Sequence, residues 1–157
     1  MTRIALDGTD RRILNSLQEN ARISNVKLAE RVNMSQSQCL RRLRQLEDLG
    51  MIDRYVTLLN KEKLGFGVTA FVLVTLERRI ANAGEKFARR IHLIPEVLEC
   101  HGITASEDYL LKVVSKDIRS YSEFMTEQLR SCEAVSHTQT FLLLDCLKLE
   151  TGLPLSP

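Results

Sequence analysis

Residues 35–50 alternate between apolar and polar positions with the period of an amphipathic helix. At about 100° per residue, one side of this helix collects apolar side chains: Cys39, Leu40, Leu43 and Leu46. The other side collects polar and basic side chains: Ser37, Gln38, Arg41, Arg44 and Gln45. The pattern predicts a helix that buries one side and exposes an arginine-bearing face.

Both ends of this helix carry sequence signals. Ser35 can accept a backbone hydrogen bond as the N-cap, and Gln38 stands three residues later, where it completes a capping box. Gly50 can supply the left-handed residue that ends a helix, and Met51 lies where it can contact Leu46. The helix is therefore expected to start at Ser35 and to stop at Gly50.

Two shorter apolar patterns precede it. Asp7 can cap a helix whose inner face would be Ile13, Leu14 and Leu17. Ser24 can cap a second helix whose inner face would be Leu28, Ala29 and Val32. Only Asn33 and Met34 separate this second helix from Ser35, and asparagine enters the left-handed region at low cost. This spacing predicts a helix-turn-helix.

The segment after Gly50 is expected to be a small wing. Residues 51–59 are rich in β-forming side chains, and Asn60 follows too soon for another helix. Together with the three helices, this segment predicts a winged helix-turn-helix domain over residues 1–62.

In a helix-turn-helix the second helix of the pair enters the major groove with its N-terminal end at the base edges. From Ser35 onward, the side chains expected nearest the bases are Gln36, Ser37, Gln38 and Arg41. The candidates for phosphate contacts are Arg22, Lys27, Arg44 and Arg54. Arg42 points to the edge of the apolar side, so it either contacts DNA or pairs with a carboxylate.

The second half of the chain has a different pattern. Strands are expected at 67–76, 97–103, 109–114 and 135–149, and helices at 85–92 and 120–129. The order β-α-β-β-α-β predicts a ferredoxin-like α+β domain over residues 63–157, with a four-stranded antiparallel sheet and both helices on one face. Apolar side chains on the other face, such as Phe71, Leu73 and Phe141, then need a second copy of the chain to cover them.

Composition narrows the class of protein. The chain of 157 residues is 44% hydrophobic and 27% charged, as expected of a soluble protein. Its net charge of +2 is uneven, because residues 1–60 hold ten basic against seven acidic residues and residues 61–157 hold twelve against thirteen. A mildly basic N-terminal half is compatible with DNA binding. With no signal segment and no apolar run near the ~20 residues of a membrane helix, we expect a cytoplasmic protein.

We find no pattern typical of a catalyst, a metal site or a cofactor site. The four cysteines, at 39, 100, 132 and 146, form no Cys-x-x-Cys pair and are expected to be reduced and mostly buried. Cys100 and His101 are adjacent, so strand alternation turns them to opposite faces. Glu107 and Asp108 are adjacent in a turn, which is typical of solvated charge.

The N-terminal residues resemble those of the Lrp/AsnC transcription regulators, also called feast/famine proteins. The matching residues are Leu6-Asp7, Asp10, Ile13-Leu14, Leu17-Gln18, Asn20-Ala21-Arg22, Leu28-Ala29, Ser35, Cys39, Arg42-Leu43, Leu46-Glu47, Gly50 and Ile52. The resemblance covers nearly the whole chain. It implies a recognition helix from Ser35, a homodimer that assembles further to an octamer, and an amino-acid effector held between dimers.

The same resemblance implies an effector loop over residues 104–109. Its members here are Thr104, Ala105, Ser106, Glu107, Asp108 and Tyr109. Asp108 and Tyr109 match the family, whereas Ala105 and Ser106 stand where relatives have glycine and an acidic or amide residue, and Ala134 also replaces a glycine. A Cβ at position 105 would disfavour a positive φ by roughly 1 kcal/mol, and Ser106 lacks a charge for an α-ammonium group.

The leading interpretation is a sequence-specific DNA-binding transcription regulator modulated by an amino acid or a related metabolite. Two alternatives remain at this stage, an effector-independent regulator with a degenerate ligand site and a DNA-organising protein with little base preference. A ferredoxin-like enzyme fused to a DNA-binding module would need a catalytic cluster that the sequence does not contain.

Overall fold

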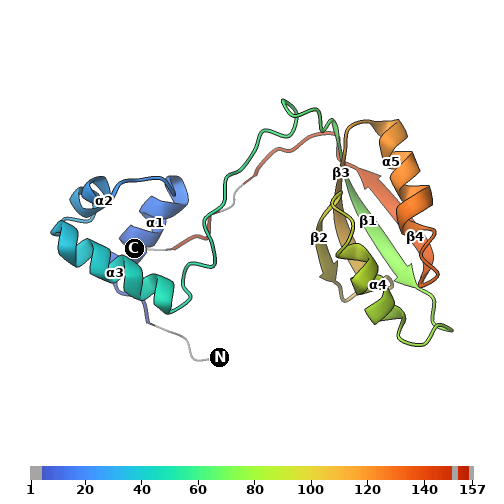
Figure 1. Cartoon of the computed structure of the whole chain (residues 1–157), viewed down its shortest axis with the longest axis horizontal. Helices are drawn as coiled ribbons and strands as arrows, with labels where there is room; N and C mark the ends of the chain where they lie inside the picture. Colours follow the sequence, from blue (N-terminus) through green and yellow to red (C-terminus); the bar gives the residue numbers. More distant parts are fainter. Residues whose placement is uncertain (1–4, 150–151, 156–157) are drawn as a thin grey trace. The chain divides into compact units, whose positions relative to one another are not determined.

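The computed structural model describes residues 5–149 and 152–155. The chain divides into two compact units, whose helices and strands are labelled in Figure 1. The first comprises the chain up to Leu58 together with the C-terminal segment from Lys148, and the second runs from Leu59 to Leu147. The chain therefore passes between the units twice.

The first unit contains the three expected helices, α1 (Gly8–Glu19), α2 (Asn25–Arg31) and α3 (Gln36–Asp48). Their N-caps are Asp7, Ser24 and Ser35, and each cap side chain accepts a backbone N–H from the first turn. The buried side chains that hold the helices together are Ile13, Leu14, Leu28, Ala29, Val32, Cys39 and Leu46. The helix-turn-helix prediction is confirmed.

The turns beside α3 have the expected backbone geometry. Asn33 ends α2 at a φ of 55°, and Gly50 ends α3 at a φ of 68°. The Met51 N–H donates to the Leu46 carbonyl and the Gly50 N–H to the Glu47 carbonyl, both at 2.9 Å, which are the two bonds of a Schellman motif.

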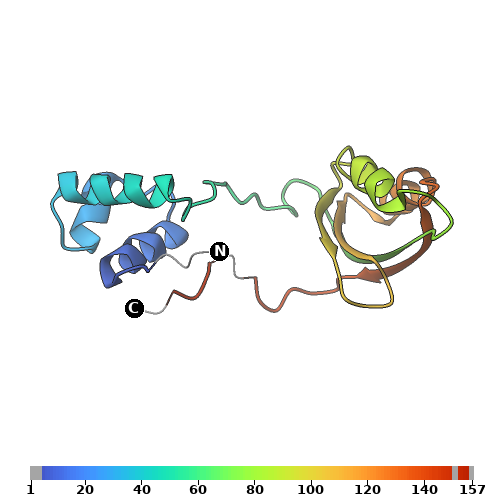
Figure 2. The same ribbon diagram turned by 90° about the horizontal axis from the view of Figure 1, so that it is seen from below.

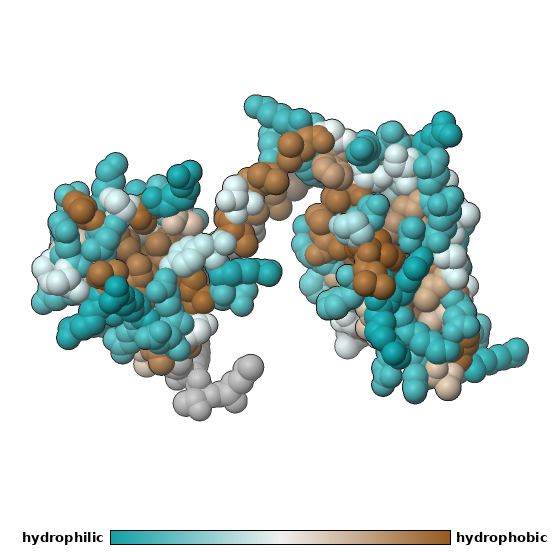
Figure 3. Space-filling view, viewed as in Figure 1, coloured by the Kyte–Doolittle hydropathy of each residue, from teal (hydrophilic) through white to brown (hydrophobic). Residues whose placement is uncertain are grey.

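Two local expectations are wrong. The Gln38 side chain accepts from the Ser35 hydroxyl at 2.9 Å, so it does not close a capping box on the backbone. Residues 51–60 form no strand, because no strand of the described residues pairs with them. Tyr55 instead donates its hydroxyl to Glu47 at 2.8 Å, and Figure 3 shows hydrophobic side chains at the surface of this extended segment.

The second unit contains the expected β-α-β-β-α-β order. Its elements are β1 (Val68–Leu76), α4 (Ala83–Ile91), β2 (Val97–Gly102), β3 (Tyr109–Ser115), α5 (Ile118–Phe124), a π-helical turn η1 (Met125–Leu129) and β4 (Val135–Leu142). The strands pair antiparallel in the order β2-β3-β1-β4. The fold class is confirmed.

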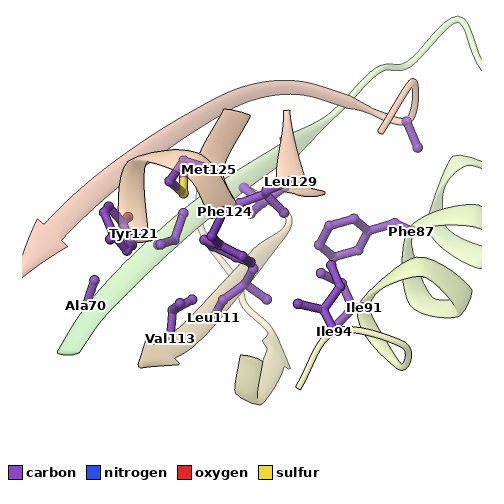
Figure 4. Packing of buried hydrophobic residues seen from close by; sticks show 13 residues of the cluster. Ala70, Phe87, Ile91, Ile94, Leu111, Val113, Tyr121, Phe124, Met125 and Leu129 are labelled. Carbon is purple, nitrogen blue, oxygen red and sulfur yellow. The ribbon is translucent and has the colours of Figure 1, made fainter. Parts of the chain in front are cut away.

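One face of this sheet packs against the helices. Figure 4 shows Phe87 and Ile91 from α4 and Phe124 and Leu129 from the α5 region, all directed toward Leu111 on the sheet. Alternate residues of the central strands are fully buried in this cluster: Ala70, Val72, Val74, Leu111 and Val113. The period-2 pattern of β1 is thereby explained, since every second side chain enters this core.

The other face of the sheet carries no helix (Figure 2). On it, Phe71 lies opposite Phe141 on β4 and Lys112 on β3. Phe141 is 47% exposed, while Phe71 and Leu73 are half-buried. An apolar strip therefore crosses the centre of this face, which we call the open sheet face.

The last strand is shorter than expected. β4 ends at Leu142, whereas the sequence pattern continued to residue 149. The side chains of Leu144 and Leu147 are 99% and 94% exposed. The leucine-rich sequence favours an extended chain there, but within the described residues no strand lies beside it.

No helix in the described residues is long and apolar enough to cross a membrane.

Candidate functional site

The outer face of α3 is a continuous polar surface. Ser37, Arg41, Arg44 and Asp48 line a shallow depression of about 440 Å³ together with Leu40 and Gln45. The expected base-facing side chains are all exposed: Gln36, Ser37, Gln38 and Arg41. Of these four, Ser37 and Arg41 lie together in the depression with Arg44.

Arg41 and Arg44 are exposed, and neither forms an ion pair within the described residues. A guanidinium group carries five donors in a planar fork, which suits guanine edges and phosphates alike. Arg22 and Lys27 are also exposed, and Arg54 lies 3.4 Å from the Asp53 carboxylate with both side chains in solvent. These five cations remain candidates for DNA contacts.

The Ser35 hydroxyl is engaged within the protein. It caps α3 by accepting from the Gln38 N–H at 3.4 Å and donates to the Gln38 side chain at 2.9 Å. Ser35 therefore acts as the N-cap that starts α3.

Arg42 forms the ion pair that was one of its two expected roles. Its Nη1 group donates to Asp7 at 2.5 Å and to Asp10 at 2.6 Å, so one guanidinium joins α3 to the start of α1. Bonds from the Asp10 backbone N–H and from Arg42 lower the pKa of Asp7 to about 2. The same carboxylates raise the pKa of Arg42.

Asp10 matches the family pattern, but the sequence analysis assigned it no structural role. Its carboxylate accepts the Asp7 backbone N–H at 3.1 Å, and the Asp7 carboxylate accepts the Asp10 N–H at 2.8 Å. The reciprocal capping box thus belongs to α1. The three-residue spacing of the two aspartates could have predicted this capping box from the sequence.

The expected effector loop connects β2 to β3. Thr104, Ala105 and Ser106 are exposed, and the Ser106 hydroxyl donates to the Glu107 carboxylate at 2.8 Å. Asp108 accepts the Leu76 N–H at 2.7 Å through its carboxylate, and its own N–H donates to the Val74 carbonyl at 2.9 Å. Asp108 therefore ties this loop to the end of β1.

Tyr109 follows the loop and packs inward. Its ring centroid lies 4.9 Å from that of Phe87 on α4. Its hydroxyl lies 3.4 Å from the place where a Cβ of Gly84 would stand. Tyr109 therefore lies against both Phe87 and the start of α4.

The expected backbone penalty at Ala105 is not present. The only described non-glycine residues with a positive φ are Asn33 and Asn82, so neither Ala105 nor Ala134 adopts the left-handed region. Ala134 is fully buried in the sheet core. Alanine fits both positions because their backbones are ordinary.

The expectation that most of the cysteines are buried is wrong. Cys39 is buried and Cys132 half-buried, whereas Cys100 and Cys146 are exposed. Burial raises the pKa of the Cys39 thiol and of the Cys100 thiol. Among the described residues no group of histidine, cysteine and acidic side chains could hold a metal ion.

Comparison with known proteins matches both units. A family model for winged helix-turn-helix DNA-binding matches residues 6–53, and one for the Lrp/AsnC ligand binding domain matches residues 69–153. The transcriptional regulator AzlB of Bacillus subtilis is 37% identical over 152 residues, which is 97% of each chain. The leucine-responsive regulatory protein of Escherichia coli K12 is 38% identical over 143 residues, 91% of this chain and 87% of that one.

A solved structure is similar over the whole length. It is a transcriptional regulator of Neisseria meningitidis in complex with L-Met, with a TM-score of 0.93 and 42% identity, covering 96% of this chain and 97% of that one.

Proposed function

Because the chain belongs to the Lrp/AsnC family of transcription regulators, we propose that it reads promoter DNA through α3 and responds to an α-amino acid. The observation that carries the DNA-reading role is the exposed face of α3, where Arg41 and Arg44 lack carboxylate partners in the described structure. Gln36, Ser37, Gln38 and Arg41 read base edges. Arg22, Lys27, Arg44 and Arg54 contact phosphates.

The effector belongs to the loop of residues 104–109. Glu107 and Asp108 provide carboxylates that suit an α-ammonium group, in place of the charge that Ser106 lacks. L-Methionine is the first ligand to test, because the similar Neisseria meningitidis regulator was solved as an L-Met complex.

The working form is an assembly of identical chains, with the open sheet face of one copy against that of another. The apolar strip of Phe71, Leu73 and Phe141 supports this arrangement, since exposed apolar strips mark interfaces. An octamer is the expected final assembly.

The DNA-reading role is tested by selection from random duplexes, followed by titration of the selected duplex and a shuffled one. We expect the selected duplex to bind at least tenfold more tightly at one fixed salt concentration, because base contacts add to phosphate contacts. Equal affinity for the two duplexes would instead support a DNA-organising protein.

The sensing role is tested by isothermal titration of the full chain with each of the twenty amino acids, L-methionine first. We expect saturable heat with at least one of them, and weaker binding in Glu107→Gln. Glu62→Gln, in an exposed segment away from the loop, is the control. The absence of heat with every amino acid would support an effector-independent regulator.

A further inference from the structure

The C-terminal segment lies on helix α1. Gln18 holds Leu153 by two bonds, since its side-chain oxygen accepts the Leu153 N–H at 2.5 Å and its side-chain nitrogen donates to the Leu153 carbonyl at 3.1 Å. Asn15, one turn earlier, donates its side-chain amide to the Leu155 carbonyl at 3.2 Å. Two amide side chains of α1 thus satisfy three backbone groups of residues 152–155, which we call the C-terminal strap.

The strap also makes apolar and close contacts. Leu155 is half-buried and packs against the core of the helix-turn-helix. Gly152 lies beside the same amide, since a Cβ there would stand in ordinary van der Waals contact with the Gln18 side-chain oxygen at 3.5 Å. The Leu155 N–H donates to the Leu153 carbonyl at 2.9 Å, which bends the strap around Pro154.

The pairing pattern points to a specific site. A primary amide that both accepts from and donates to one residue imitates the pairing of a neighbouring β-strand. A single weak contact would not fix the position of the strap along α1. The bonds from Asn15 and Gln18, together with the half-buried Leu155, place Leu153 beside Gln18 and Leu155 beside Asn15.

We propose that the α1 face of Asn15 and Gln18 is a docking site for the chain's own C-terminal strap, and that this contact tethers the sheet-bearing unit to the DNA-reading helices a second time. The first connection is the chain that follows α3, and the second is the chain that follows β4. Closing this second connection restricts the freedom of both units, since only ten residues lie between Leu142 and Leu153.

Helix α1 contacts both the strap and the recognition helix α3. The first turn of α1 holds Arg42 of α3 through Asp7 and Asp10, and the later turns hold the strap. A change in the strap therefore acts on the same helix that positions α3.

The test uses the full-length chain and the exchange of individual backbone amides measured by NMR. In the native protein we expect the Leu153 amide to be protected. Gln18→Ala should remove that protection at least tenfold, while Gln18→Glu, which keeps the acceptor and loses the donor, should give an intermediate loss. Glu30→Ala, at an exposed position of α2 that makes none of these bonds, should leave it unchanged.

Three results would overturn the proposal. One is exchange of the native Leu153 amide at the rate of an unstructured peptide, and another is full protection retained in Gln18→Ala. The third comes from mixed labelled and unlabelled chains, if contacts between Gln18 and Leu153 were found only between different copies. If Gln18→Ala loses its helical circular dichroism signal, Leu155→Ala provides the same comparison through the apolar contact.

Discussion

At the scale of single residues, Arg41 and Arg54 separate base reading from phosphate binding. Arg41 lies on the exposed face of α3, whereas Arg54 follows the helix beside Asp53. Arg41→Ala should reduce discrimination at one base position by about 1–3 kcal/mol. Arg54→Ala should weaken all duplexes alike and flatten the dependence of affinity on salt. Titration of selected and shuffled duplexes measures both, and an equal loss on the two duplexes for Arg41→Ala would disprove its role in base reading.

Residue-level features that depend on near neighbours were predictable from the sequence. The caps Ser24 and Ser35 and the left-handed Asn33 and Gly50 are local, because each depends on groups within about one helical turn. The partners of Gln18 were not predictable, since Leu153 is 135 positions away in the chain. A pattern of periodicity contains no information on such a distant pair.

At the scale of elements, the ion pair between α1 and α3 predicts a pH-dependent stability. Asp7 has a pKa lowered to about 2 by the Asp10 N–H and by Arg42, against an ordinary value of 3.8. A lowered carboxyl pKa stabilises the fold fully above the ordinary value, and this contribution is lost as the pH falls toward 2. Arg42→Ala should therefore lower the melting temperature by a few degrees at pH 7, and the difference from the native protein should shrink between pH 4 and pH 2.

The measurement is a series of thermal melts at stepped pH, together with an NMR titration of the Asp7 carboxyl. In Arg42→Ala we expect the pKa of Asp7 to move up toward its ordinary value. Arg41→Ala is the matched control, because Arg41 lies on the same helix without a carboxylate partner in the described structure. An unchanged pKa of Asp7 in Arg42→Ala would show that the helix caps alone set it.

Element type followed from the sequence where the element supplies its own hydrogen bonds or faces a core. The helices α1, α2 and α3 and the strand β1 agree with their hydrophobic periods. The strand expected at 51–59 and the end of β4 did not, because a strand needs a partner and neither segment pairs with another strand within residues 5–149 and 152–155. The π-helical turn after α5 was also missed, since the bond from the Arg130 N–H to the Met125 carbonyl has a spacing that the hydrophobic period does not reveal.

At the scale of the whole molecule, exposed apolar surface is the main feature that a single chain leaves unexplained. Val56, Leu58 and Leu59 in the segment after α3 are 60%, 69% and 71% exposed, and Leu144 and Leu147 after β4 are more exposed still. The open sheet face adds Phe71 and Phe141. Because water disfavours such surface at roughly 25 cal/mol per Å², further copies of the chain are the natural cover.

The open sheet face gives this expectation a direct test. Phe71→Asp places a charge at the centre of the apolar strip, opposite Phe141, and pressing that charge against apolar side chains of a second copy is costly. We expect the mass measured by light scattering to fall toward that of one chain. Phe141→Asp should act in the same direction with less risk to the fold, because Phe141 is 47% exposed on the edge strand β4.

Ser122→Asp is the control for this test, since it adds the same charge at an exposed position of α5 on the opposite side of the sheet. It should leave the mass unchanged. Circular dichroism of each variant separates loss of assembly from loss of fold. An unchanged mass for both phenylalanine variants, with the fold intact, would show that the open sheet face is not the interface and would transfer that role to the exposed leucines that follow β4.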